Sequence, residues 1–278
     1  MCEECGCGIA AEEQGHSHGH AHDGHTHAHR HDHDHGHEHS HTHDHDHDHD
    51  HEHGGTAAGD AAAAARTVTL ETKLLARNDA MAAENRAWLA EHGVTALNLI
   101  SSPGAGKTLL LEKTLERLRG DVPCAVITGD QQTDHDARRL EGKGARVRQI
   151  ETVSSCHLDA ARVGELLPEV AGDGTKLLFI ENVGNLVCPA AFDLGENFKI
   201  ALLSTTEGED KPVKYPTIFS LAPVVLLTKM DLSEHLDWDL SQCREYLRKI
   251  HPGVFVFEVS AKTGNGMDAW IQYLKSLV

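Results

Sequence analysis

The hydrophobic positions of the chain follow two alternating patterns from residue 96 to the C-terminus. Short, nearly continuous apolar runs favour strands buried on both faces, and apolar positions three and four residues apart favour amphipathic helices. Because the two patterns take turns, the sequence predicts an α/β fold, with a mostly parallel sheet and helices on both faces. The expected strands cover residues 96–101, 123–128, 146–150, 176–181, 198–204, 223–228 and 254–259. The expected helices cover residues 107–119, 134–141, 157–169, 238–250 and 266–277.

The segments before residue 96 predict a linker and a lead-in helix. Residues 67–92 have apolar positions at helical spacing with few breakers, and Gly93 ends the pattern. We expect this helix either to pack on the sheet or to contribute to a dimer interface. Residues 54–66 are small, polar and alanine-rich, which is typical of a linker that turns helical toward its end.

A glycine-rich stretch, Ser101–Thr108, joins the first expected strand to a helix. In this setting, backbone N–H groups and the helix N-terminus can face a phosphate. Lys107 is expected to reach the β- and γ-phosphates, and the Thr108 hydroxyl to bind Mg²⁺. Ser101 stands where such a motif usually begins with glycine, and a chance glycine-rich turn is the alternative. The predicted P-loop residues are Gly104, Ala105, Gly106, Lys107 and Thr108.

Carboxylates follow two of the expected strands. Glu181 ends one apolar run, and Asp130 and Asp136 follow another. Ligands of parallel sheets bind at the carboxyl ends of strands, where a carboxylate can hold Mg²⁺ and orient the attacking water. Glu181 is the first choice, and a helix cap or a solvated loop is the alternative for either Asp. With Lys107 and Thr108 these residues form the predicted catalytic set. No arginine finger is evident in the sequence, so we expect slow hydrolysis.

Two later loops indicate which base is bound. Thr228–Asp231 follows an apolar run and resembles the guanine-reading motif Asn-Lys-x-Asp, with Thr in place of Asn. Asp231 would accept from guanine N1–H and the 2-amino group, and Lys229 would lie over the base. The loop of Ser260, Ala261 and Lys262 resembles the second guanine loop. The sequence therefore predicts GTP and GDP as ligands, and an ATPase with coincidental motifs is the alternative.

Thiols and an imidazole indicate a metal site within the same domain. Cys156 and His157 are adjacent just before an expected helix, and Cys188 lies seven residues after Glu181. Two thiolates and an imidazole can together hold one metal ion. A buried free thiol is the alternative for Cys188, and is the interpretation we give to the remaining two thiols, Cys124 and Cys243.

The first 53 residues carry two further metal-binding patterns. Cys2, Cys5 and Cys7 are spaced so that one short loop can wrap a single ion, which suits zinc, copper(I) or nickel. Between residues 16 and 53 lie 19 of the 24 histidines. They are interleaved with Asp, and the tract contains almost no apolar residue. This tract should be disordered without metal and should bind several divalent ions. A cysteine-bearing disordered tail and a solvating, pH-responsive tail are the alternatives.

Charge and composition narrow the function classes. The formal net charge is −18, and residues 1–60 hold 14 acidic side chains and one basic side chain. The remainder is only mildly acidic and has no basic face in its sequence, which argues against nucleic acid. No run of 18 apolar residues suggests a membrane span, and no secretory signal is visible. Seven cysteines, an odd number, favour reduced thiols and a cytoplasmic location.

These motifs together resemble the HypB family of hydrogenase nickel-incorporation GTPases over essentially the full chain. The most specific run is residues 181–189, Glu-Asn-Val-Gly-Asn-Leu-Val-Cys-Pro. The resemblance also covers the thiol head, the histidine tract, Ser101–Thr108, Gly129–Asp130, Cys156–Asp159 and residues 207–212.

The resemblance implies a P-loop GTPase of the dimeric SIMIBI class that uses Mg²⁺. It would deliver nickel to the large-subunit precursor of [NiFe]-hydrogenase together with a HypA-type nickel chaperone. It also implies nickel at Cys2, Cys5 and Cys7, and nickel or zinc at the internal site. The expected organisation is a Cys-rich metal-binding segment (1–15), a disordered His-rich tract (16–53), a linker (54–66) and a GTP-binding domain (67–278).

Two other functions remain open from the sequence. In a nickel storage or buffering protein, the histidine tract would carry the main function and the nucleotide domain would have a secondary role. A metallochaperone GTPase for another metalloenzyme, such as urease, would share the fold. The urease type fits less well, because its Cys-Pro-His motif reads Cys188-Pro189-Ala190 here.

Overall fold

The computed structural model describes residues 57–130, 135–152, 156–172 and 174–278, with side chains from residue 72 onward apart from those of Asp130, His135 and Asp136. The Cys-rich segment (1–15), with Cys2, Cys5 and Cys7, and the His-rich tract (16–53) lie outside the described residues. Among the described helices, none combines the length and apolar composition needed to cross a membrane.

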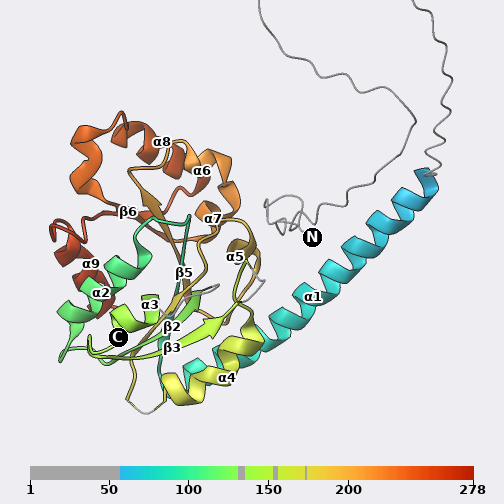
Figure 1. Cartoon of the computed structure of the whole chain (residues 1–278), viewed down its shortest axis with the longest axis horizontal. Helices are drawn as coiled ribbons and strands as arrows, with labels where there is room; N and C mark the ends of the chain where they lie inside the picture. The colour runs from blue at the N-terminus through green and yellow to red at the C-terminus, as the bar shows by residue number, and fades with distance from the viewer. Residues whose placement is uncertain (1–56, 131–134, 153–155, 173) are drawn as a thin grey trace, which may run out of the picture.

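Within the described residues, seven strands form one sheet in the order β3-β2-β4-β1-β5-β6-β7 (Figure 1). Every neighbouring pair is parallel, which confirms the predicted α/β class with a parallel sheet. The connections cross between neighbours on both sides of β1, so the central strands end where ligands of such sheets bind. The strands are β1 (Thr95–Ser101), β2 (Cys124–Asp130), β3 (Ala145–Glu151), β4 (Leu177–Glu181), β5 (Phe198–Ser204), β6 (Val224–Thr228) and β7 (Phe255–Glu258).

The helices of the sheet region begin close to the expected positions. The one clear shift is α4, which begins at Ala160 because the Asp159 carboxylate accepts from Arg162 N at 2.9 Å and caps the helix there. Four elements of at most six residues were not expected, since they are too short to show a helical period. The helices are α1 (Ala57–His92), α2 (Lys107–Leu118), α3 (His135–Leu140), α4 (Ala160–Val170), α5 (Cys188–Ala191), α6 (Lys211–Lys214), α7 (Pro216–Leu221), the 3₁₀ helix η1 (Met230–His235), α8 (Leu240–Ile250) and α9 (Met267–Lys275).

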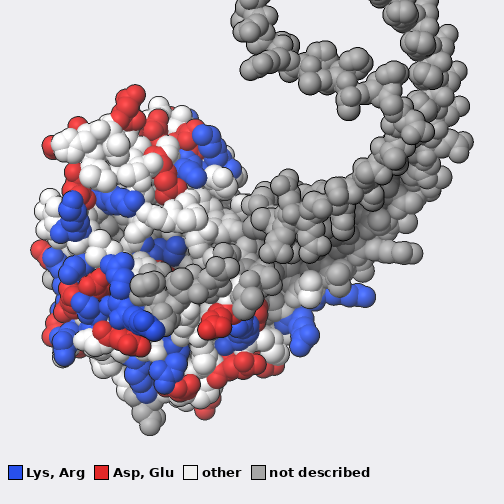
Figure 2. Space-filling model, in the orientation of Figure 1, with Lys and Arg blue, Asp and Glu red and all other residues white. Residues whose placement is uncertain are grey.

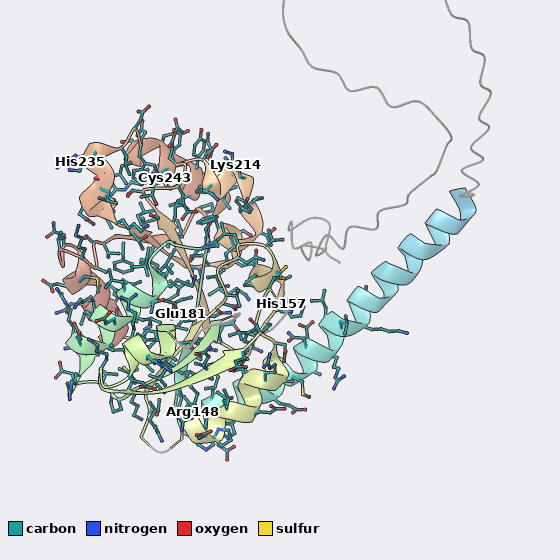
Figure 3. All side chains as sticks on the ribbon, viewed as in Figure 1. Arg148, His157, Glu181, Lys214, His235 and Cys243 are labelled. Atoms are coloured by element: carbon teal, nitrogen blue, oxygen red, sulfur yellow. The ribbon has the colours of Figure 1, made fainter. Side chains whose placement is uncertain are left out.

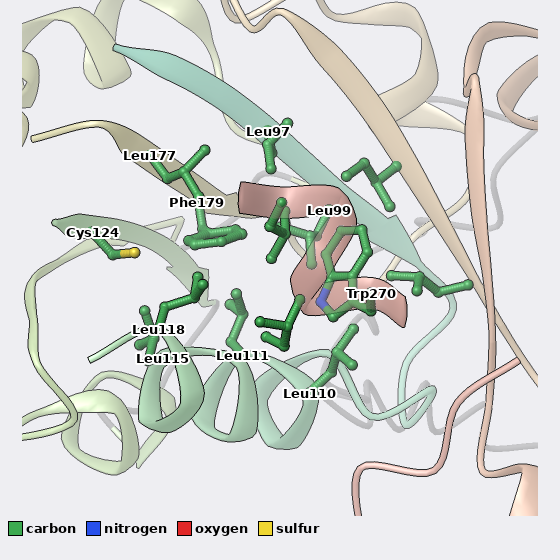
Figure 4. Close-up of a cluster of buried hydrophobic side chains, with 14 of the residues drawn as sticks. Leu97, Leu99, Leu110, Leu111, Leu115, Leu118, Cys124, Leu177, Phe179 and Trp270 are labelled. Atoms are coloured by element: carbon green, nitrogen blue, oxygen red, sulfur yellow. The ribbon is translucent and has the colours of Figure 1, made fainter. Parts of the chain in front are cut away.

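Alternate residues of each strand face opposite sides of the sheet, and both sides are covered by helices. On one side, Leu97 and Leu99 of β1 pack against leucines of α2 and Trp270 of α9 (Figure 4). On the other side, Ala96 packs with α1 and α4, and Ile100 packs with α7 and α8. Each fully buried leucine contributes about 1.5–3 kcal/mol of transfer free energy, so these two layers fix the strand ends that carry the polar loops.

Helix α1 begins at Ala57, within the segment of residues 54–66 that the sequence assigns to a linker. Alanine has the highest helix propensity, and the run of five alanines from residue 61 carries the helix through that segment. The C-terminal part of α1 lies against α4, while the rest extends away from the domain (Figure 1). The structure confirms that this helix packs on the sheet, because Leu89 of α1 lies in one buried cluster with Ala96 of β1 and Leu178 of β4. A dimer contact stays a prediction.

Candidate functional site: a nucleotide cleft beside a thiol–imidazole cluster

The phosphate loop lies at the carboxyl end of β1, the central strand. Gly104 and Gly106 have φ values of 72° and 92°, a conformation that side-chain-bearing residues rarely adopt. Lys107 and Thr108 are buried in the first turn of α2, directly after this turn. The Lys107 ammonium donates to Ser101 Oγ at 2.9 Å. Ser101, which replaces the glycine that usually begins the motif, thus gives the buried ammonium an oxygen partner.

A cavity of about 360 Å³ opens beside this loop and is where a triphosphate can lie. The Thr108 hydroxyl donates to Glu181 Oε1 at 2.8 Å, so the structure brings together two of the residues predicted to hold Mg²⁺. Thr108 and Glu181 both offer oxygen atoms as metal ligands, which is the ligand type that Mg²⁺ requires. The residues that line the cavity are Pro103, Gly104, Gly106, Lys107, Thr108, Leu109, Gly129, Arg139, Glu181, Asn182, Val183 and Gly184.

The segment after Glu181 is held tightly against the phosphate loop. A Cβ added to Gly184 would lie 2.9 Å from Pro103 Cα, so only glycine fits this approach without a shift. For the other two predicted carboxylates the structure describes only the backbone. Asp130 is the last residue of β2 and Asp136 lies in α3, and both side chains lie outside the described part of the chain.

A second cavity, of about 220 Å³, adjoins the first and is lined by four of the five residues predicted to read the base, Lys229, Asp231, Ala261 and Lys262, but not by Ser260. The two cavities share Gly106 and Leu109, so they lie side by side at the phosphate loop and together make up the nucleotide cleft. Asp231 accepts from Ser260 Oγ at 2.6 Å, which joins the two predicted guanine loops. The residues that line the second cavity are Ala105, Gly106, Leu109, Leu110, Thr228, Lys229, Asp231, Leu232, Val259, Ala261 and Lys262.

Thr228, which stands in the place of the usual Asn, connects the base loop to the phosphate loop. Its buried hydroxyl donates to the carbonyl of Ala105 at 2.7 Å. Lys229 follows with a φ of 56°, the one positive value at a non-glycine residue among those described. A Cβ built on Gly106 would lie 3.9 Å from Lys229 Cε, so the lysine stem runs over the phosphate loop toward the base cavity.

The structure also brings Cys156, His157 and Cys188 together. One ligand atom from each lies within 4.8 Å of the other two, and Cys156 Sγ is 3.6 Å from His157 Nδ1. The His157 ring stacks on Phe192 with centroids 3.7 Å apart, which fixes its orientation. Burial lowers the pKa of His157, against an opposing effect of Asp159, and so favours the neutral ring that binds metals. Two thiols and one imidazole match the donors of a three-ligand zinc or nickel site with an open position.

Helix α1 holds the two segments that carry these ligands. Asn78 accepts from Ala160 N at 2.9 Å and donates to Asp193 O at 2.7 Å. Asn85 donates to Ala160 O at 2.7 Å and to Leu194 O at 3.0 Å. Ala160 follows His157, and Asp193 and Leu194 follow Cys188 on its segment, so each asparagine bonds to both ligand-bearing segments. Figure 3 places His157 at the side of the domain next to α1 and Glu181 nearer its centre.

Two functional candidates escaped the sequence analysis. Arg139 of α3 lines the phosphate cavity and pairs with Glu112 at 2.9 Å, although no arginine had been singled out for the phosphates. Lys143 binds the same Glu112 at 2.9 Å, and its hydrogen bond is the main cause of the lowered pKa of that carboxyl. The asparagines of α1 are the second case, because only the fold brings them to the metal cluster.

The other two thiols of the described residues, Cys124 and Cys243, suit a structural role. Cys124 and Cys243 are buried, and burial raises the pKa of each to about 12, as suits the structural role predicted for them. On the face seen in Figure 2, basic and acidic side chains are interspersed.

The fold, the phosphate loop and the joined base cavity define a P-loop nucleotide-binding protein of the α/β class. Residues 95–258 match the CobW/HypB/UreG nucleotide-binding domain. The hydrogenase maturation factor HypB of Azotobacter chroococcum mcd 1 is 52% identical over 210 residues, which are 76% of this chain and 69% of that protein. HypB of Escherichia coli K12 is 48% identical over 211 residues, 76% of this chain and 73% of that protein.

Solved structures agree with these sequence matches. The crystal structure of HypB from Helicobacter pylori in complex with nickel has a TM-score of 0.68 and 39% identity, over 72% of this chain and 94% of that one. HypB from Archaeoglobus fulgidus has a TM-score of 0.69 and 37% identity, over 73% and 99%. The chain belongs to the HypB family of hydrogenase maturation factors, which confirms the resemblance found in the sequence.

Proposed function

We propose that this chain is a GTP-hydrolysing nickel metallochaperone that inserts nickel into a [NiFe]-hydrogenase precursor. One observation carries the proposal. Glu181, which contacts Thr108 in the phosphate cavity, and Cys188, which belongs to the thiol–imidazole cluster, lie on one segment seven residues apart. Binding and hydrolysis of GTP would therefore act on the same segment that holds the metal cargo.

The polar residues predicted for the nucleotide, together with Arg139, have the following proposed roles. Lys107 and the N-terminus of α2 bind the phosphates. Thr108 and Glu181 would hold Mg²⁺, which neutralises phosphate charge when bound. Asp130 and Asp136 are proposed to orient water, and Arg139 to offset charge on the phosphates. Asp231, with Lys229 and the loop of residues 260–262, reads guanine.

Nickel is the cargo rather than a resident cofactor in this proposal. Cys2, Cys5 and Cys7 and the tract of residues 16–53 collect the ion, and the cluster of Cys156, His157 and Cys188 holds nickel or zinc before release. The nickel named in the Helicobacter pylori structure supports this choice of metal. We further propose a homodimer that works with a HypA-type nickel chaperone and with the hydrogenase large-subunit precursor.

Storage is the second candidate, favoured by the 19 histidines between residues 16 and 53. Hydrogenase maturation would be measured at scarce and at ample nickel, with the wild type, with residues 16–53 deleted and with Lys107→Ala. An insertase predicts that the deletion matters only at scarce nickel, whereas Lys107→Ala abolishes maturation at both. If Lys107→Ala matures hydrogenase normally at ample nickel, storage is the better account. Separately, ATP that competes equally with GTP for binding would refute the guanine assignment.

A further inference from the structure

A polar residue interrupts the apolar run of the central strand. Asn98 lies between Leu97 and Leu99 in β1 and is fully buried. A buried amide costs roughly 1–3 kcal/mol unless it is hydrogen-bonded, so its partners carry the explanation for its presence. They lead from the nucleotide cleft to the thiol–imidazole cluster.

At the nucleotide end, the partner of Asn98 is Asn182, the residue directly after Glu181. Asn182 Nδ2 donates to Asn98 Oδ1 at 3.2 Å. Asn182 Oδ1 of the same side-chain amide accepts from Val183 N at 3.0 Å and from Leu158 N at 3.3 Å. Leu158 follows His157, so this bond joins the strand end that carries Glu181 to one metal-binding segment.

At the other end, Asn98 Nδ2 donates to Glu196 Oε1 at 3.1 Å. Glu196 is almost fully buried; its second oxygen accepts from Leu194 N at 2.7 Å, and it pairs with Lys199 at 3.0 Å. The Lys199 ammonium donates to Phe192 O at 2.7 Å and lies 3.4 Å from Pro189 O. These two carbonyls follow Cys188 on the segment that supplies the third ligand.

We propose that Asn98, Asn182, Glu196 and Lys199 form a relay that couples the nucleotide state to the geometry of the metal cluster. The inference rests on the proposed function and names its positioning residues; none of the four is a metal ligand. The two bonds of Asn98 are buried, and those of Lys199 are partly buried. Breaking a buried one leaves an unsatisfied polar group at a cost comparable to a coupling free energy. The two ends therefore move together rather than independently.

The test uses the full chain carrying Cys2→Ser, Cys5→Ser and Cys7→Ser. In this parent, the thiolate-to-nickel charge-transfer band reports on Cys156 and Cys188. The other two thiols, Cys124 and Cys243, are buried, and burial raises the pKa of each to about 12. The histidine tract contains no thiol. A chelator fixes free nickel, so the tract does not alter the occupancy that is measured. The coupling factor is the ratio of nickel Kd with GDP to nickel Kd with a non-hydrolysable GTP analogue.

We expect a coupling factor between about 5 and 150, or its inverse, in the parent. Asn98→Leu keeps nearly the same shape, removes both side-chain bonds and should bring the factor to about one, with GDP affinity retained. Thr114→Val is the matched control: Thr114 is buried and accepts from Trp270 Nε1 at 3.1 Å on the opposite face of the sheet. It should keep the parent's factor. If Asn98→Leu fails to bind GDP, Glu196→Gln is expected to lower the factor in its place.

The outcomes separate the relay from the proposed function. A parent that couples and an Asn98→Leu or Glu196→Gln variant that couples equally overturn the relay and leave the metallochaperone intact. A parent with no coupling between nickel and nucleotide overturns both. By thermodynamic reciprocity, nickel must change the affinity for the GTP analogue, relative to GDP, by the same factor in each variant, which checks the measurement independently.

Discussion

The bond between Thr228 and the phosphate loop is open to a direct test. Thr228→Val replaces the hydroxyl with a methyl group of nearly the same size, so the packing around it is kept. What is lost is the 2.7 Å bond to Ala105 O, and the carbonyl is left in a site where Ala105 is 1% exposed. An unsatisfied buried acceptor costs about 1–3 kcal/mol. For a domain of this size, a loss of about 2 kcal/mol lowers the melting temperature by roughly 4–8 °C.

The same change should weaken nucleotide binding. The Ala105 carbonyl belongs to the loop shared by the base and phosphate cavities, so a looser loop costs ordering free energy when GDP binds. We expect GDP affinity to fall about 10-fold, equivalent to about 1.4 kcal/mol. Binding is measured by titration of a fluorescent GDP analogue, and stability by thermal unfolding of nucleotide-free protein. Thr228→Asn, which restores the more common residue with its own amide donor, should keep both values near wild type.

Three results would refute parts of this reasoning. If Thr228→Val binds GDP as tightly as the wild type and is less stable, the bond supports the fold alone. If neither value changes, the hydroxyl contributes nothing in solution. A loss of affinity in Thr228→Asn as large as in Thr228→Val would show that the size of the side chain matters there, and not its donor.

Three further predictions follow from the cleft and the metal cluster. Arg139→Ala should lower the single-turnover rate constant of GTP hydrolysis at least about 10-fold, because a cation is lost from the phosphate cavity; Lys143→Ala, which breaks a bond to the same glutamate outside that cavity, should not. At pH 8, iodoacetamide should modify half-buried Cys156 well before Cys124, whose pKa of about 12 leaves a thiolate fraction of about 10⁻⁴; equal rates by peptide mass spectrometry would contradict the burial. Asn85→Ala should lower the free energy of unfolding by about 1–3 kcal/mol in urea titrations, since two buried carbonyls lose their donor.

Much of the fold could be predicted because its signals are local. A run such as Val224–Leu227 is apolar at every position, and only a strand covered on both faces buries all of them. The same alternation of apolar runs and helices predicted a mostly parallel sheet. The start of α1 was less predictable, because an alanine-rich segment is compatible with a linker and with a helix.

The candidate site was predictable only as far as its motifs are contiguous. Lys107 and Thr108 belong to one short motif, and their place beside Glu181 followed from the rule that polar loops meet at the strand ends. Arg139 belongs to no motif, and its distance from the phosphate loop depends on how α3 packs. The metal cluster was predictable in part. Cys156 and Cys188 were assigned to one site because both are metal-ligand types, whereas the contacts of the asparagines that hold their segments were not predicted.

Polar residues at buried positions indicate the functional region, and a search for apolar periodicity alone does not detect them. The lead-in helix was assigned from its apolar positions, yet Leu74 is 54% exposed, whereas Asn78 and Asn85 are 7% and 6% exposed. Asn78 and Asn85 are seven residues apart, two helical turns on one face, and that face meets the metal segments. Asn98 breaks the apolar run of β1 in the same way. A buried amide is tolerated in a strand or helix only where its hydrogen bonds offset the free-energy cost of desolvation. Here each such amide bonds to segments next to the metal cluster. Buried asparagines therefore mark the functional region in this sequence as clearly as its cysteines do.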